Sequence, residues 1–116
     1  MTVRRIVANL TADPAELRDF YRELLDLEIV MDHGWIVTLA AEASQTPQLS
    51  IAREGGLGTA VPDLSIEVDD VDAIHRRALA AGHEIVYGPA DEPWGVRRFY
   101  LRDPQGRLLN ILSHQR

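Results

Sequence analysis

The side chains best suited to chemistry gather near the carboxyl end, in the stretch PWGVRRFYLRDPQGRLLNI that spans residues 93–111. Trp94 offers a flat apolar surface on which a planar ligand can stack, and its alternative place is in the hydrophobic core. Arg97 and Arg98 carry planar guanidinium groups that can hold a carbonyl or an anionic group. Because neighbouring residues of a strand point to opposite faces, one of the two arginines can face a ligand site. The alternative is that it forms a surface ion pair in this acidic protein.

Asn110 is the one polar residue in the apolar run LLNIL that ends this stretch. A buried amide needs hydrogen-bond partners whether or not a ligand is present. Two interpretations therefore stay open at this point. Asn110 either contacts a ligand or forms hydrogen bonds within a filled sheet.

A second group of polar residues alternates with apolar ones in DLSIEV, residues 63–68. Asp63, Ser65 and Glu67 share one face of a predicted strand because side chains repeat with period two. If the apolar face covers a helix, Glu67 borders the ligand site, and burial would raise its pKa and make it a general base. The alternative is an ordinary hydrated strand face.

The four histidines form no His-x-His or His-x-x-x-His pair, and the chain has no cysteine. Disulfides, thiol catalysis and cysteine-bound zinc are therefore excluded. His33 precedes Trp35 in a predicted turn and is the second candidate for a general base near neutral pH, against a solvated turn residue. Trp35 is either a second aromatic wall or part of the core.

The 116 residues are enough for one compact domain, with a net charge of −6 and a pI near 5.1. An acidic surface repels nucleic-acid phosphates and anionic lipids, so neither partner is expected. No apolar run approaches the length of a membrane span, and MTVRRIVANL lacks the features of a secretory leader. A cytoplasmic protein is the resulting expectation.

An internal repeat organises the chain, since residues 4–30 can be aligned with residues 62–86. The triplet EIV occurs at 28–30 and again at 84–86. Both segments run from an apolar strand through an aspartate and a helix into a second strand, which predicts one βαβββ unit used twice. Module one is expected at about 1–54, a Gly-rich linker at about 55–61, and module two at about 62–116.

Helix signals begin at Asp13, with Pro14 at the first helical position, and at Asp70. Apolar stripes follow at helical spacing, and Gly82 is expected to end the second helix. The stripe residues are Leu17, Phe20, Tyr21 and Leu24 in the first helix and Val71, Ile74, Ala78 and Ala81 in the second. Turns are predicted at residues 32–34 and 103–106.

These features together resemble the vicinal-oxygen-chelate superfamily, the group of glyoxalases, bleomycin-resistance proteins and extradiol dioxygenases. The matching parts are EVDDVDA, the helix end Ala81-Gly82, PWG, DPQG, and Phe20-Tyr21 followed by LLDL, where the family has Gly in place of Asp26. The resemblance implies an α+β fold whose two tandem βαβββ modules form a concave, barrel-like mixed sheet with a central cleft. It favours Arg97, at the WGxR position, as the arginine in that cleft.

Enzymes of that family hold a divalent metal with four side chains from the first and last strands of the modules. Carried over by position, these places fall on Ile6, Ser50, Asp63 and Asn110. Only Asp63 is an ordinary ligand for a hard metal, and one carboxylate with one amide is too few. The adjacent residues are apolar, so a one-residue shift of the alignment does not restore a site. No metal and no cofactor are expected, and Asn110 stands where the family has a metal-binding glutamate.

The resemblance and the residues together favour a metal-independent small-molecule binding protein. Its ligand is expected to be apolar or aromatic with a polar or anionic handle, and a homodimer is expected. The predicted binding residues are Trp94, Arg97, Trp35, Asn110 and Asp63. The alternatives are a lyase, isomerase or dioxygenase, with atypical metal ligands or with Glu67 or His33 as base, and a dimerising accessory domain without a ligand.

Overall fold

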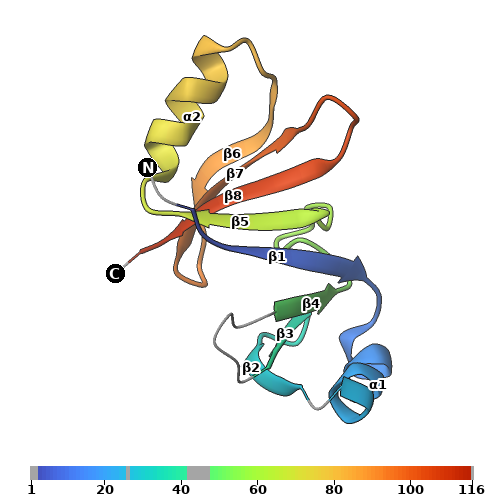
Figure 1. Ribbon diagram of the computed structural model, residues 1–116. Coiled ribbons are helices and arrows are strands. Elements are labelled where there is room, and N and C mark those ends of the chain that lie inside the picture. The colour runs from blue at the N-terminus through green and yellow to red at the C-terminus, as the bar shows by residue number, and fades with distance from the viewer. Residues whose placement is uncertain (1–2, 26, 42–47, 116) are drawn as a thin grey trace. The chain divides into compact units, whose positions relative to one another are not determined.

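The computed structural model of the chain describes residues 3–25, 27–41 and 48–115. Within them lie eight strands and two helices (Figure 1). They form two compact units: Val7–Val61, here called the first module, and Met1–Ile6 with Pro62–Arg116, called the second module. The first strand therefore contributes residues to both.

The first module has strand order β2-β3-β4-β1. β4 runs parallel to β1, and the other neighbours are antiparallel. Its elements are β1 (Val3–Thr11), α1 (Pro14–Leu25), β2 (Glu28–Asp32), β3 (Ile36–Ala40) and β4 (Gln48–Ala52).

The second module repeats this plan with strand order β6-β7-β8-β5, in which β8 runs parallel to β5. Its elements are β5 (Leu64–Val68), α2 (Val71–Ala80), β6 (Ile85–Asp91), β7 (Val96–Arg102) and β8 (Leu108–His114). Element order and pairing agree between the modules, which confirms the predicted α+β fold of two tandem βαβββ units.

The register also repeats. In the first module Asn9 pairs with Ser50 and Ser50 with Thr38, and in the second module Ser65 pairs with Asn110 and Asn110 with Tyr100. Laterally paired residues lie on the same face of a sheet. Each module therefore carries an equivalent row of side chains across its sheet.

Both helices begin where the sequence predicts. The Asp13 carboxylate accepts a hydrogen bond from the Ala15 amide at 3.1 Å, and the Asp70 carboxylate accepts one from the Ala73 amide at 3.1 Å. These bonds satisfy amides that have no partner inside the helix. At the other end of α2, Gly82 takes a positive φ of +81°, a conformation that glycine adopts readily.

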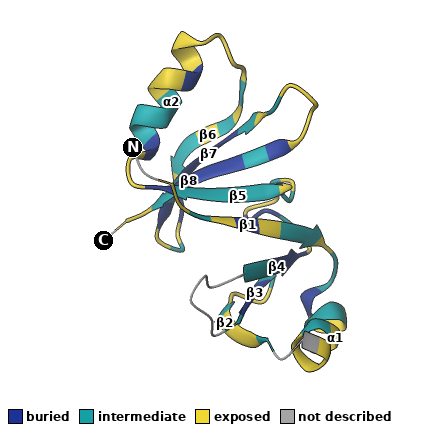
Figure 2. Ribbon diagram, viewed as in Figure 1, coloured by how far each residue is buried: buried dark blue, intermediate teal, exposed yellow. Residues whose placement is uncertain are grey.

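The core of the second module lies between α2 and one face of its sheet, where buried Val71 packs with Val68, Phe99 and Ile111. Figure 2 shows the buried residues concentrated on β7 and β8. The face that carries Phe99 and Ile111 is thus covered by α2. Alternate residues of the same strands point to the opposite face.

The core of the first module contains Val37, Leu39 and Ile51, against which Leu17 and Tyr21 of α1 pack. The expectation of one continuous apolar stripe on α1 is wrong in part, because Phe20 and Leu24 are 57% and 66% exposed. Leu17 and Tyr21 are four residues apart and form a ridge that packs against this core.

The predicted turns are present. The Gly34 amide donates to Asp32 Oδ1 at 2.9 Å, and Asp103 Oδ1 accepts from the Gln105 and Arg107 amides at 2.9 Å each. No helix in the described part of the chain is long and apolar enough to cross a membrane.

Candidate functional site

Polar and aromatic side chains meet on the face of the second module's sheet that points away from α2. The register places Ser65 of β5, Asn110 of β8, Tyr100 of β7 and Tyr87 of β6 side by side. Arg98 lies two residues before Tyr100 and therefore shares this face. We call the surface defined by these five residues the Asn110 face.

Asn110 lies at the centre of this row and is only 8% exposed. Its amide nitrogen Nδ2 donates to Ser65 Oγ at 3.2 Å. Its carbonyl oxygen Oδ1 is buried and has no hydrogen-bond partner among the described residues. Nearly all buried polar atoms in proteins are hydrogen-bonded, so this unpaired carbonyl is an exception that calls for an explanation.

Arg98 is 3% exposed and forms a buried ion pair with Glu92, with 2.8 Å between Nη2 and Oε2. Its Nη1 donates to Tyr100 Oη at 2.8 Å. The remaining oxygen of Glu92 accepts from Tyr87 Oη at 3.0 Å. Burial and the neighbouring Glu92 carboxylate together raise the pKa of Tyr87, so this phenol stays protonated at neutral pH.

Three aromatic rings surround the Arg98 guanidinium. Its central carbon lies 4.9 Å from the ring centre of Trp94, 5.0 Å from that of Tyr100 and 5.2 Å from that of Tyr87. A cation over ring faces at these distances is attracted by the aromatic quadrupoles. Trp94 and Asn110 are among the residues named from the sequence, whereas Tyr87, Glu92 and Tyr100 are not. The register of β8 with β7 is the feature that adds Tyr100 to the site.

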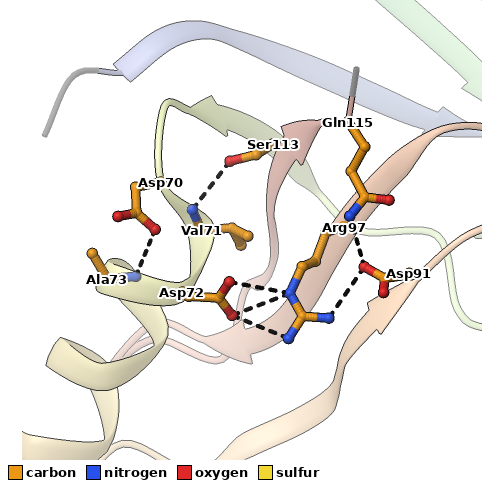
Figure 3. Close-up of polar contacts among 8 residues, drawn as sticks. All are labelled: Asp70, Val71, Asp72, Ala73, Asp91, Arg97, Ser113 and Gln115. Carbon is orange, nitrogen blue, oxygen red and sulfur yellow. Dashed lines mark hydrogen bonds and ion pairs between the residues drawn. The ribbon is translucent and has the colours of Figure 1, made fainter.

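Arg97 lies on the opposite face from Arg98, as strand alternation predicts. Figure 3 shows its guanidinium between Asp72, at the start of α2, and Asp91. Arg97 Nε lies 3.1 Å from Asp72 Oδ1, and Nη1 lies 3.2 Å from Asp91 Oδ1.

Hydrogen bonds to Asp72 and Asp91 raise the pKa of Arg97. Gln115 donates a further hydrogen bond to Asp91 at 2.9 Å. These contacts connect α2 with the neighbouring strands β6 and β7. The role of Arg97 in ligand binding remains a prediction.

Glu67 lies on β5 with a side chain that is 15% exposed, between Arg5 and His114. Arg5 Nε is 2.6 Å from Oε1, and His114 Nδ1 is 3.0 Å from Oε2. Partial burial acts to raise the pKa of Glu67, but hydrogen bonds from His114 and Arg5 outweigh it and hold the pKa below its ordinary value. The expectation of a raised pKa is therefore wrong, because the strand face supplies charge partners as well as burial.

The remaining predicted site residues are His33, Trp35 and Asp63. His33 is exposed in the β2–β3 turn, and its ring stacks near Trp35 with 6.3 Å between centres. Trp35 is half-buried in the first module. Asp63 accepts a hydrogen bond from the Leu108 amide at 2.8 Å and extends the pairing of β5 with β8. Their roles in ligand binding or catalysis stay predictions.

The four positions implied for a metal do not fit one. Ile6 has no donor atom, and the Ser50 hydroxyl is paired with Thr38 Oγ1 at 2.7 Å in a buried contact. One Asp63 oxygen is engaged by the Leu108 amide, and Asn110 offers a neutral carbonyl. No group of three or more His, Cys, Asp or Glu side chains in the described ranges is arranged to hold a metal ion.

Comparison with known proteins agrees with this architecture. A sequence model of the Glyoxalase/Bleomycin resistance protein/Dioxygenase superfamily matches residues 6–111. A protein named "Putative glyoxylase CFP32" from Mycobacterium bovis is 44% identical over 46 residues, which are 40% of this chain and 18% of that protein. The same figures hold for the protein of that name from Mycobacterium tuberculosis, so the chain matches less than a fifth of the length of these curated relatives.

Two solved structures share the fold over nearly the whole chain. One is described as an NAD-dependent benzaldehyde dehydrogenase from Legionella pneumophila, with a TM-score of 0.78 and 20% identity, covering 96% of this chain and 100% of that one. The other is a glyoxalase/bleomycin resistance protein/dioxygenase superfamily member from Vibrio splendidus, with a TM-score of 0.63 and 19% identity, covering 97% and 99%. Identities this low show the fold alone.

Proposed function

This chain belongs to the glyoxalase/bleomycin resistance protein/dioxygenase superfamily, and we propose that it is a metal-independent small-molecule binding protein of that group. The proposed ligand is apolar or aromatic and carries one polar handle. It binds on the Asn110 face of the second module, with Trp94 as an aromatic wall. Arg97 lies on the opposite face of this sheet and is not part of the proposed site. Ligand contacts by Trp35 and Asp63 stay predictions.

The observation that carries this proposal is the buried Asn110 Oδ1, which has no partner among the described residues. Leaving such an acceptor unpaired costs about 1–3 kcal/mol, and a ligand that pairs with it recovers part of that cost. Trp94 and Tyr87, which are partly exposed, supply the apolar contact area that a small ligand needs.

The side chains at these positions suit ligand binding better than they suit a chemical reaction. At the implied metal positions, the Ser50 hydroxyl and one Asp63 oxygen already form intramolecular hydrogen bonds. Sequestration requires only a complementary surface, whereas a chemical step requires groups that stabilise a transition state.

The test is a fragment screen of planar aromatic compounds followed by two-dimensional amide NMR of the full chain. Ligands are expected to shift the indole resonance of Trp94 and the side-chain amide of Asn110. Trp94→Leu is expected to weaken binding at least tenfold. Phe20→Leu is the matched control, because this exposed aromatic side chain lies on α1 of the first module. Equal loss in both variants, or no shift near Asn110 with any fragment, contradicts the proposal.

A superfamily enzyme is the second candidate, and the contact between Glu67 and His114 favours it. A carboxylate that binds Nδ1 of a histidine orients the ring and leaves Nε2 as a proton acceptor. The measurement is NMR of hydroxyacetone in heavy water, which reports exchange of its carbon-bound protons. Exchange by the native chain that is lost in His114→Gln supports the enzyme. Equal exchange rates in both proteins remove this candidate.

A further inference from the structure

The Asn110 face also constrains the chemistry of the ligand, and this inference rests on the function proposed above. We propose that the ligand is a neutral or cationic planar aromatic molecule that donates an N–H or O–H hydrogen bond to Asn110 Oδ1. The anionic group that the sequence analysis allowed on the ligand is thereby replaced by a hydrogen-bond donor. Three features of the site lead to this conclusion.

The first feature is the orientation of the Asn110 side chain. Its Nδ2 is turned to Ser65 Oγ at 3.2 Å, so the amide group uses its donor within the sheet. The atom that has no partner within the described ranges is Oδ1, and a carbonyl oxygen can only accept hydrogen bonds. A complementary ligand atom must therefore be a donor.

The second feature is that the arginines of this region are already engaged. Arg98 pairs with Glu92 at 2.8 Å, and Arg5 pairs with Glu67 at 2.6 Å. Farther along β7, Arg102 donates to the Gly106 carbonyl at 3.0 Å. An anionic ligand would have to compete with these partners while losing its own hydration, which is costly. The net charge of −6 adds a long-range repulsion.

The third feature is the set of aromatic faces. Tyr87 and Tyr100 lie with ring centres 5.4 Å apart, and with Trp94 they already surround one planar cation, the Arg98 guanidinium. Ring faces carry negative electrostatic potential, so they favour planar groups that are neutral or positively charged over anions. The partly exposed rings of Trp94 and Tyr87 and the unpaired carbonyl of Asn110 thus favour the same class of ligand.

The experiment uses pairs of compounds that differ in one property. Indole and benzofuran have nearly the same shape, but only indole has an N–H donor. Dissociation constants are measured by NMR titration of the full chain at pH 7. Indole is expected to bind about five- to tenfold more tightly than benzofuran, the factor that one buried hydrogen bond supplies. Tryptamine, a cation at this pH, is expected to bind more tightly than the anion indole-3-acetate.

Asn110→Leu removes the acceptor while keeping the size of the side chain. This variant is expected to bind indole and benzofuran equally. Asn110→Asp keeps acceptor oxygens at the same place and adds a charge, so its preference for tryptamine is expected to increase. The Asp variant also provides the test if the Leu variant does not fold.

The possible results separate this inference from the proposed function. If indole and benzofuran bind equally to the native chain, the donor requirement is wrong although the binding function stands. If the preference for indole persists in Asn110→Leu, the donor is recognised elsewhere and the role of Asn110 is wrong. If none of the four compounds binds, both this inference and the binding function that they probe are contradicted.

Discussion

At the scale of single residues, the site depends on how each charged group is paired. Glu92 and Arg98 form an ion pair whose side chains are 2% and 3% exposed. Arg53 and Asp13 form one of similar length, 2.9 Å, whose side chains are 54% and 42% exposed. Burial removes the water that would otherwise stabilise a lone charge, so the two pairs should respond differently to the loss of a partner.

Glu92→Leu is expected to lower the free energy of unfolding by about 3–5 kcal/mol, because it leaves the Arg98 guanidinium buried without its carboxylate. The double variant Glu92→Leu/Arg98→Met is expected to recover much of this loss. Arg53→Met, the exposed control, should cost less than about 1 kcal/mol. Urea unfolding measures all three, and equal effects of Glu92→Leu and Arg53→Met would show that burial does not govern this pair.

The pairing of Glu67 predicts a dependence of stability on pH. Because its pKa in the folded chain lies below the ordinary value of 4.5, ionised Glu67 stabilises the fold. This contribution is fully present above pH 4.5 and is lost as the pH falls through the lowered pKa. The stability difference between the native chain and Glu67→Gln should therefore be constant from pH 5 to 6 and shrink in more acidic buffer.

Thermal unfolding between pH 3 and 6 checks this expectation. Glu23→Gln, a substitution at an exposed residue of α1, is the control. A difference between native chain and Glu67→Gln that grows as the pH falls would mean that the sign of the Glu67 shift is wrong.

At the scale of elements, the β6–β7 hairpin that carries Trp94 and Arg98 is held by close backbone packing. Gly88 of β6 has a φ of +77°, and a Cβ atom there would lie 2.5 Å from the Arg98 carbonyl oxygen. Gly82 has a similar φ of +81°, but a Cβ atom there would meet nothing within 4 Å. The two glycines share a positive φ, but only Gly88 lacks space for a Cβ atom.

Gly88→Ala is therefore expected to cost about 1–3 kcal/mol more than Gly82→Ala, the range for forcing an extra methyl into a packed site. The comparison cancels the cost of a left-handed backbone, which both variants have. Urea unfolding of the two variants gives the difference directly. Equal costs would indicate that the hairpin yields at Gly88 and does not hold Arg98 rigidly.

The sequence predicted the elements well because their signals are local. The aspartate caps, the turn glycines and the period-two alternation in residues 63–68 each act over a few residues, and each was confirmed. The α1 stripe failed at Phe20 and Leu24 because helical spacing shows which residues share a side and does not show how wide the contact with the sheet is.

At the scale of the whole molecule, the two modules keep one plan and differ in chemistry. The row in the first module contains a closed hydrogen bond between Thr38 and Ser50 at 2.7 Å. The equivalent positions of the second module hold Tyr100 and Asn110, with the Asn110 carbonyl left unpaired. The two modules thus share one backbone plan, and we propose that the ligand site lies on the second module.

A homodimer remains the expected assembly. Each chain has a mass of 13.0 kDa, so sedimentation at micromolar concentration is expected to give a species of twice that mass. Phe20 and Leu24 provide exposed apolar surface that such an assembly could cover. A single 13.0 kDa species at 100 μM would contradict the expectation.

The sequence by itself determined the duplicated βαβββ order and the helix starts, because these follow from local periodicity and residue type. It also singled out Trp94 and Asn110, whose roles in ligand binding stay predictions. Tertiary structure decided which charges meet. Arg97 and Arg98 are adjacent in the chain, yet one binds Asp72 beside α2 and the other is buried with Glu92. Glu67 acquired partners from β1 and from the end of β8, which reversed its expected pKa shift. Such pairings join residues far apart in sequence, and only the register of the strands brings them within hydrogen-bond distance.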